Sequence, residues 1–270
     1  MKRVQFIRIF AVLSCLLLTA AGGFAQTGAG ESYTPQSGQA GKDVVWVPTP
    51  QELVDAMLNM AKVTSSDYVI DLGSGDGRTV ITAAKRGATA VGIEYNPEMV
   101  ALAKRNAAKE GVSAKATFIE ADIFESDFSK ASVITMFLLT RINLELRPKI
   151  LDMKPGTRIV SNAFDMGDWK PDQTTNLTEN CSAWCTAYFW VVPAKVNGTW
   201  KLDNGRIVLN QVFQNITGTI TVNGKDTNLT GKLDGDKISF NAGGTEYTGT
   251  VSGNTISGTR AGGSTWKATR

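Results

Sequence analysis

The chain contains no histidine, and this absence narrows the chemistry open to it. Its 270 residues include no His and three Cys. Histidine is the commonest protein ligand of metals and the usual general base near neutral pH. The two cysteines beyond residue 25 cannot fill a tetrahedral zinc shell by themselves. We therefore predict no metal site, and any proton acceptor would be a carboxylate, a tyrosine or water.

Cysteine is also scarce. Cys15 lies in the N-terminal apolar run, which leaves Cys181 and Cys185 for the rest of the chain. In an oxidising compartment two such thiols can form a lasting disulfide. A separation of four residues does not guarantee bridging geometry, so two separate buried thiols remain the alternative.

The net positive charge of the chain comes entirely from its first 25 residues. Lys2, Arg3 and Arg8 precede the apolar run 9–21, and small residues surround Ala25, as in a signal peptide. We expect export to the periplasm or beyond, with cleavage near residue 25. The alternative is a leader kept as a membrane anchor with the protein on the cytoplasmic face, and we expect membrane association only in that case.

Removing residues 1–25 takes away three positive charges and no negative ones, so the formal charge falls from +3 to zero. Binding to a phosphate backbone requires a basic surface. We therefore expect no nucleic acid partner.

The composition divides the rest of the chain into three parts. Residues 26–45 are rich in Gly, Ser, Gln and Thr, which predicts a flexible linker. From residue 46 to 197, short apolar strands alternate with helices, the pattern of a parallel sheet covered on both faces. The expected strands begin at Tyr68, Ala90, Thr117, Val133, Arg158, Thr174 and Cys185. The last two follow each other without a helix, which predicts a closing antiparallel hairpin.

Two further features complete this outline. Thr49, Pro50 and Glu52 form a capping-box pattern ahead of a helix that extends to about Lys62. Residues 198–270 alternate apolar and polar positions, with Gly and Asn turns about every ten residues, which predicts a small antiparallel β domain of six or seven strands. The predicted fold class is thus a doubly wound, mostly parallel seven-stranded α/β domain followed by an all-β domain.

The most informative segment directly follows the first expected strand. It runs Asp71, Leu72, Gly73, Ser74, Gly75, Asp76, Gly77, Arg78. Glycines at alternate positions allow a tight turn and a close approach of the backbone to a ligand. Dinucleotide-binding turns use a different glycine spacing and place a pyrophosphate at the helix N-terminus. Carboxylates at Asp71 and Asp76 would repel a diphosphate but attract the ammonium group of a methionine moiety.

Acids also end the next two strands. Glu94 is placed to accept hydrogen bonds from both hydroxyls of a ribose. Asp122, in the sequence Ala121-Asp122-Ile123, is placed to accept from an adenine amino group. Three acids on successive strands beside a glycine turn favour an adenosyl amino-acid ligand over a nicotinamide.

These motifs resemble those of class I S-adenosylmethionine-dependent methyltransferases from about residue 47 to 195. The segments 47–50, 71–78, 146–149 and 154–161 are similar to the group that contains the lysine methyltransferases of adenine nucleotide translocase and of the ATP synthase c subunit, with bacterial relatives. The resemblance implies S-adenosylmethionine as cofactor, and it implies that Thr49, Phe137 and Asp165 face the methyl group. The cofactor-binding residues that we predict are Asp71, Gly73, Ser74, Gly75, Asp76, Gly77, Glu94, Asn96, Asp122 and Ile123.

The resemblance further implies a protein-lysine N-methyltransferase acting on a protein partner, with Asp165 and Thr49 as candidate catalytic residues. A small-molecule methyltransferase is the enzymatic alternative. An exported, non-catalytic binding protein that keeps the fold is the alternative of another class, because the cofactor is made in the cytoplasm. The predicted export also leaves open how such an enzyme would be supplied with cofactor.

Overall fold

The computed structural model describes residues 33–179 and 181–270, so the predicted leader lies outside the described residues. The α/β domain contains α1 (Gln51–Met60), β1 (Tyr68–Leu72), α2 (Arg78–Lys85), β2 (Thr89–Glu94), α3 (Pro97–Lys109), β3 (Ala116–Glu120), β4 (Val133–Met136), α4 (Thr140–Leu151), β5 (Arg158–Asn162), β6 (Gln173–Asn176) and β7 (Thr186–Val191). Among the described residues, no helix is long and apolar enough to cross a membrane.

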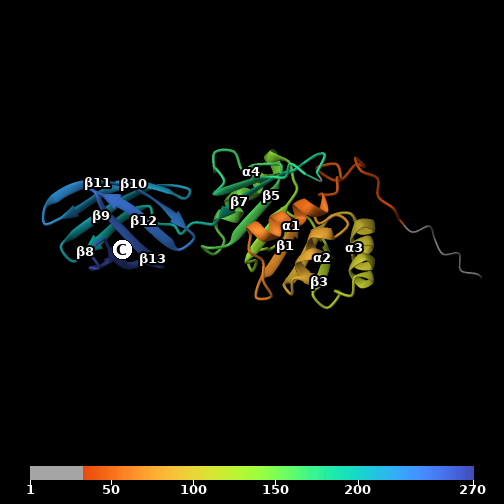
Figure 1. Ribbon diagram of the computed structural model, residues 1–270, viewed down its shortest axis with the longest axis horizontal. Coiled ribbons are helices and arrows are strands. Elements are labelled where there is room, and N and C mark those ends of the chain that lie inside the picture. The colour runs from red at the N-terminus through yellow and green to blue at the C-terminus, as the bar shows by residue number, and fades with distance from the viewer. Residues whose placement is uncertain (1–32, 180) are drawn as a thin grey trace, which may run out of the picture. The chain divides into compact units, whose positions relative to one another are not determined.

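The sheet of this domain confirms the predicted fold class. Its seven strands lie in the order β3-β2-β1-β4-β5-β7-β6. Figure 1 labels four of them, β3, β1, β5 and β7, across the sheet. The first five pair in parallel, and the expected hairpin β6–β7 closes the sheet with antiparallel pairs. The chain runs outward from β1 through β2 to β3 and returns to β4 on the other side of β1. Ligands of open α/β sheets bind at such a change of direction, beyond the carboxyl ends of the strands.

Two apolar clusters cover the two faces of the sheet. Successive residues of a strand point to opposite faces, so Val69 packs with α1, α2 and α3 while Ile70 packs with α4. Both residues are buried. This arrangement holds the strand ends in place and leaves their carboxyl edge free for a site.

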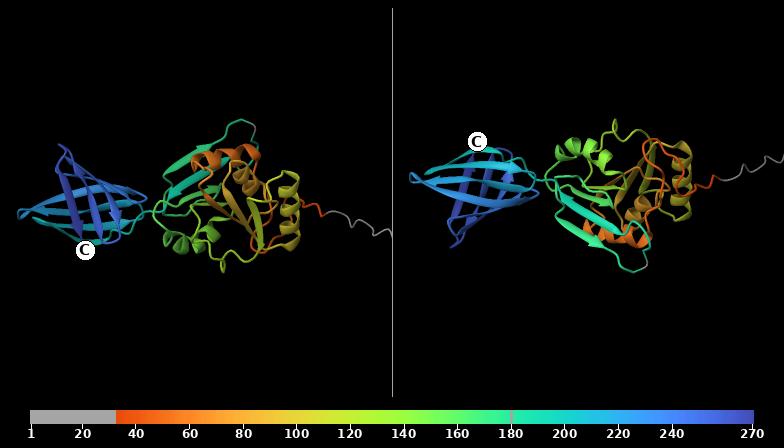
Figure 2. Two further views of the ribbon diagram at one scale, coloured as in Figure 1. Left: turned by 90° about the horizontal axis from the view of Figure 1, so that it is seen from below. Right: turned by 90° about the horizontal axis from the view of Figure 1, so that it is seen from above.

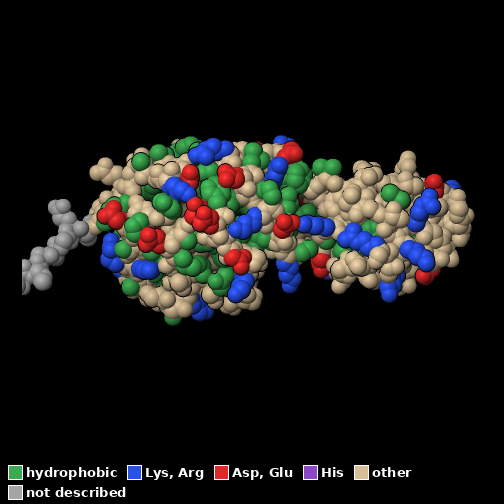
Figure 3. All heavy atoms as spheres, turned by 180° about the vertical axis from the view of Figure 1, so that it is seen from behind, with side chains coloured by type: hydrophobic (Ala, Val, Ile, Leu, Met, Phe, Trp, Pro, Cys, Tyr) green, Lys and Arg blue, Asp and Glu red, His purple; other side chains and the backbone are tan. Residues whose placement is uncertain are grey.

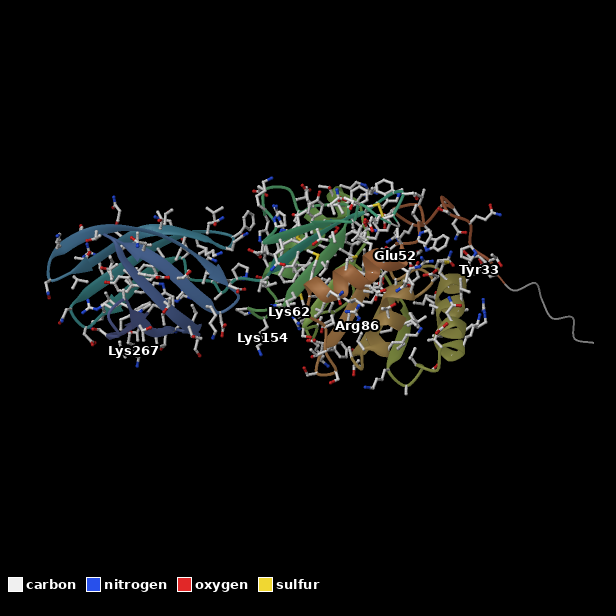
Figure 4. All side chains as sticks on the ribbon, in the orientation of Figure 1. Tyr33, Glu52, Lys62, Arg86, Lys154 and Lys267 are labelled. Atoms are coloured by element: carbon white, nitrogen blue, oxygen red, sulfur yellow. A yellow bond between two sulfur atoms is a disulfide. The ribbon has the colours of Figure 1, made fainter. Side chains whose placement is uncertain are left out.

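The capping box predicted for α1 is wrong. Pro50 is the N-cap residue, and no side chain caps the helix. Glu52 is exposed on α1, where Figure 4 labels it. The hydroxyl of Thr49 instead lies 3.3 Å from Nδ2 of Asn162 at the end of β5, so it faces the sheet rather than the helix.

The flexible linker expected up to residue 45 is not what the structure shows. Residues 38–46 are folded and lie against the α/β domain. The backbone N–H of Gly38 donates to the carbonyl of Trp46 at 2.8 Å, and the N–H of Trp46 donates to the carbonyl of Gln39 at 2.9 Å. Val44 packs against the cluster that covers α4. A guanidinium N–H of Arg141 donates to the carbonyl of Asp43. We call residues 38–46 the strap. It has few aliphatic side chains, but it folds because residues distant in sequence, such as Arg141, contact it.

The C-terminal domain is a closed antiparallel barrel. Its strands are β8 (Gly198–Leu202), β9 (Gly205–Val212), β10 (Asn215–Val222), β11 (Lys225–Asp234), β12 (Lys237–Ala242), β13 (Thr245–Ser252), β14 (Thr255–Arg260) and β15 (Thr265–Thr269). The prediction of six or seven strands was wrong, because eight strands form a complete circuit. Figure 2 shows this domain from two sides. Trp200, Phe240 and Tyr247 belong to the apolar cluster inside it. A barrel of eight strands is narrow enough to be filled by such side chains.

Candidate functional site

A cleft lies at the carboxyl ends of β1, β2 and β4, where the direction of the chain changes. Ten of the twelve predicted site residues line it: Thr49, Asp71, Gly73, Ser74, Gly75, Asp76, Glu94, Asn96, Asp122 and Ile123. Residues 39–46 of the strap and Phe137 line it as well. The structure therefore brings the glycine turn and the acids of three strand ends into one concave site.

Glu94 connects the second strand to the glycine turn. Its Oε2 accepts a hydrogen bond from the backbone N–H of Gly75 at 2.9 Å, and its Oε1 accepts from the N–H of Asn96 at 2.9 Å. The side chain of Asn96 caps α3 by accepting from the N–H of Glu98 at 2.9 Å. Each carboxylate oxygen has two lone-pair positions, so Glu94 keeps capacity for two more donors. This is what the two hydroxyls of a ribose require.

Asp71 is the buried acid of the cleft. Its side chain is 6% exposed, and its Oδ1 accepts from the hydroxyl of Thr135 at 2.6 Å. Burial raises the pKa of Asp71 to about 7, the Thr135 hydrogen bond opposes this shift, and the negative charges of Glu94 and Asp76 add to it. A ligand with a positive charge would compensate a carboxylate held in such a place.

Asp76 differs from Asp71 because its charge already has a partner. Both of its carboxylate oxygens accept from Arg78, with Nη2 of Arg78 at 2.6 Å from Oδ2. Nη1 of Arg78 also donates to the carbonyl of Thr49 at 2.8 Å. Arg78 therefore links the glycine turn to the segment before α1, a role that was not predicted from the sequence. The two uncompensated acids of the cleft are thus Asp71 and Glu94, and these suit a cationic ligand with a sugar.

Two predicted residues do not line the cleft. A Cβ at Gly77 would lie 2.7 Å from the Phe118 ring and 2.9 Å from Cβ of Ala103, so this glycine allows α2 and α3 to pack closely on β3. Oδ1 of Asp165 accepts from the hydroxyl of Thr140 on α4 at 3.3 Å and from the N–H of Gly167 at 3.2 Å, so this oxygen links α4 to the turn after β5.

Another glycine that the sequence analysis missed shapes the turn. A Cβ at Gly92 would lie 2.4 Å from Oγ of Ser74. Ser74 is buried, and its Oγ has no hydrogen-bond partner among the described residues. Since Gly92 is opposite Asp71 in the β1–β2 pairing, its lack of a side chain leaves room for the turn to lie against β2.

Comparison with known proteins gives this site a family. The model of the ANTKMT methyltransferase domain matches residues 71–173. A protein-lysine N-methyltransferase of Saccharolobus islandicus (strain REY15A) is 44% identical over 164 residues, which make up 60% of this chain and 97% of that protein. The chain belongs to this methyltransferase family.

Other relatives agree on the reaction class. The lysine N-methyltransferase of the ATP synthase C subunit from Homo sapiens is 34% identical over 131 residues, 48% of this chain and 56% of that protein. The chain thus spans only about half of that human relative. A solved RNA methyltransferase from Salinibacter ruber, in complex with S-adenosyl-L-homocysteine, is 45% identical with a TM-score of 0.52, and the match covers 56% of this chain and 96% of that one. The protein is an S-adenosylmethionine-dependent methyltransferase, and S-adenosylmethionine is its cofactor.

The residues of the cleft fit this cofactor. Asp71 offers a buried carboxylate to the ammonium group, Glu94 has free acceptor positions for the ribose, and Gly73 and Gly75 have φ angles of 75° and 53° that keep the turn free of side chains. When bound, S-adenosylmethionine supplies a methyl group on a positively charged sulfur, and transfer to an amine leaves S-adenosylhomocysteine and a proton.

Proposed function

We propose that the protein methylates lysine side chains of another protein. The observation that carries this proposal is the match to the Saccharolobus protein, which is named for this activity and is spanned over 97% of its length at 44% identity. The human relative, named for methylating lysine in a protein of the ATP synthase, supports the same acceptor over a shorter segment. The task of the protein would be to hold the acceptor nitrogen in line with the methyl group, since alignment at near-attack distance provides much of the rate of such a displacement.

RNA is the second candidate acceptor, because the Salinibacter protein is named as an RNA methyltransferase. The charge of this chain favours protein. Residues 26–270 have no net charge, and Figure 3 shows Lys and Arg interspersed with Asp and Glu on the face in view rather than gathered into a basic track. A phosphate backbone would need such a track.

Labelling separates these candidates. The purified protein is incubated with methyl-tritiated cofactor and, in parallel, with total cell protein, total RNA and a small-molecule extract. We expect label in protein, and amino-acid analysis after hydrolysis should recover it as methyl-lysine. Label in RNA or in small molecules alone would overturn the lysine proposal.

We also propose that the mature protein acts outside the cytoplasm. The order of charged, apolar and small residues in the leader supports this, and so does a disulfide between Cys181 and Cys185, since disulfides persist in oxidising compartments. N-terminal sequencing of the protein recovered from its natural host should begin near Gln26. A soluble cytoplasmic form that still begins at Met1 would contradict the proposal.

A further inference from the structure

An aromatic side chain stands exposed inside the small ring closed by the disulfide. Cys181 and Cys185 are bonded, with their Cα atoms 5.8 Å apart, in the connection between β6 and β7. Trp184 lies between them, and its φ of 59° is in the left-handed region, where bulky side chains are rare. Its side chain is 45% exposed. A strained residue of this kind persists only where its surroundings impose it, and such residues gather at functional sites.

Trp184 contacts two phenylalanines that follow the ends of β4 and β5. Its ring centre lies 5.8 Å from that of Phe137, edge-on, and 5.6 Å from that of Phe164. The two phenylalanine rings stack on each other with centres 6.0 Å apart. Phe137 also lines the cofactor cleft, so this aromatic cluster adjoins the place where the methyl group is presented.

A polar pair lies at the same edge of the sheet. Asn162 ends β5 and is fully buried, and its Nδ2 lies 3.3 Å from Oγ1 of Thr49, which lines the cleft. Oδ1 of Asn162 has no hydrogen-bond partner among the described residues. A buried carbonyl oxygen without a donor is costly, and native proteins keep few of them. Asn162 does not line the cleft itself, so its contribution there is to hold the Thr49 hydroxyl that does.

We infer that Trp184, Phe137 and Phe164 form the wall of the acceptor channel, and that the Cys181–Cys185 disulfide holds Trp184 in it. The inference rests on the proposed lysine acceptor: the rings contact the apolar stem and the ammonium group of a lysine as it enters, and Thr49, which Asn162 holds in place, lies at the inner end of this path. Tryptophan is the best aromatic partner of an ammonium group, and long basic side chains bury their stems against apolar surfaces. Trp184 is therefore a specificity-determining residue that acts on the acceptor and not on the cofactor.

The test measures the acceptor and the cofactor separately. Total cell protein serves as acceptor and methyl-tritiated S-adenosylmethionine as donor, and methyl-lysine is the product counted. We expect Trp184→Ala to raise the KM for acceptor protein by about tenfold, from the loss of ring contacts with a cation and its stem, while the KM for the cofactor stays unchanged. Trp184→Phe should retain most of the acceptor affinity. Phe213→Ala is the matched control, because Phe213 is also aromatic with a positive φ of 52°, but its ring stacks on Trp169 and not on Phe137 or Phe164.

The disulfide gives a second, independent measurement. Cys181→Ser, or reductant added to the wild type, should raise the acceptor KM in the same direction, and reductant should have no further effect on Cys181→Ser. Thermal melting of each variant identifies any that does not fold. If Trp184→Ala does not fold, the acceptor KM of Trp184→Phe is compared with that of wild type instead. An acceptor KM that is equal in wild type, Trp184→Ala and Cys181→Ser overturns this inference alone. A wild type that makes no methyl-lysine overturns the proposed function, and the inference falls with it.

Discussion

Lys42 of the strap places its ammonium group on the carboxylate of Asp122, 80 residues later in the chain. The same ammonium group lies 4.9 Å from the centre of the Tyr95 ring. The hydrogen bond from Lys42 lowers the pKa of Asp122, and in return it raises the pKa of Lys42. The acid predicted to receive the adenine amino group is thus occupied by a residue of the protein itself.

The first prediction concerns this competition. If adenine and Lys42 share the Asp122 carboxylate, then Lys42→Met should tighten the binding of S-adenosylmethionine by about two- to fivefold, the range expected for an exposed ion pair. The wild-type affinity should also rise with salt, because salt screens the pair that has to open. Calorimetric titration at two salt concentrations checks both, with the exposed Lys104→Met as control. Weaker binding by Lys42→Met would instead make Lys42 part of the cofactor site.

The second prediction uses the buried carboxyl of Asp71, whose pKa is about 7 in the folded protein. An acid with a raised folded pKa binds more protons in the folded than in the unfolded state, so wild-type stability should fall as pH rises from about 4 to 7. Asp71→Asn removes this loss. Above pH 7 it should raise the free energy of unfolding of the cofactor-free protein by about 2–4 kcal/mol, measured by chemical denaturation.

The same substitution should weaken cofactor binding. The ammonium group of the cofactor requires an ionised Asp71, so wild-type affinity should fall by up to about tenfold per pH unit below 7, whereas Asp71→Asn should bind weakly and without this dependence. Asp203→Asn, on an exposed turn, is the control. A flat wild-type profile between pH 5 and 8 would show that Asp71 does not meet the ammonium group.

Local patterns were enough to predict the α/β domain, because its five parallel strands contain short apolar runs and its glycine turn follows β1 directly. The strap was missed because its contacts come from partners far away in sequence, as in the pairing of Lys42 with Asp122. The packing at Gly77 also depends on distant residues, because the Phe118 ring of β3 and the Ala103 methyl group of α3 leave no room for a side chain there.

The strand count of the barrel could not be read from turn residues alone. The turn between β9 and β10 is made by Phe213 and Gln214, and neither residue is typical of a turn. Closure depends on the pairing of Thr269 with Lys201, which no local pattern indicates. Trp184 carried no signal in the sequence, since its importance depends on a positive φ and on rings brought to it by two other strands.

The third prediction is that the α/β domain folds without the barrel. Its apolar clusters draw on residues up to Val192, apart from the contribution of Phe213. The barrel adds a stacking contact of Phe213 with Trp169 and hydrogen bonds from Gln214 to Lys170 and Asp172. A chain ending at residue 197 should therefore melt cooperatively, at about 5–10 °C below the full chain. Loss of the cooperative transition would show that the two parts share a core.

The fourth prediction concerns Gly75. A Cβ at this position would lie 2.5 Å from Nε1 of Trp46, and its φ is 53°. Gly75→Val should therefore displace the strap as well as obstruct the ligand, and it should reduce cofactor binding more than a substitution of Glu94 does. Circular dichroism should show a folded protein, because the position lies at the edge of the cleft.

Glu94→Ala removes the two acceptor oxygens that hold the N–H groups of Gly75 and Asn96 and that remain open to the ribose. Hydrogen bonds to an ionised acceptor contribute about 1.5–3 kcal/mol, so the affinity for S-adenosylmethionine or its demethylated product should fall by about one to two orders of magnitude. Glu98→Ala is the matched control, since Glu98 is an exposed acid four residues later on α3. Calorimetric titration compares the two variants with wild type. Unchanged binding by a folded Glu94→Ala protein would mean that the ribose lies elsewhere, and the assignment of the whole cleft would then have to be revised.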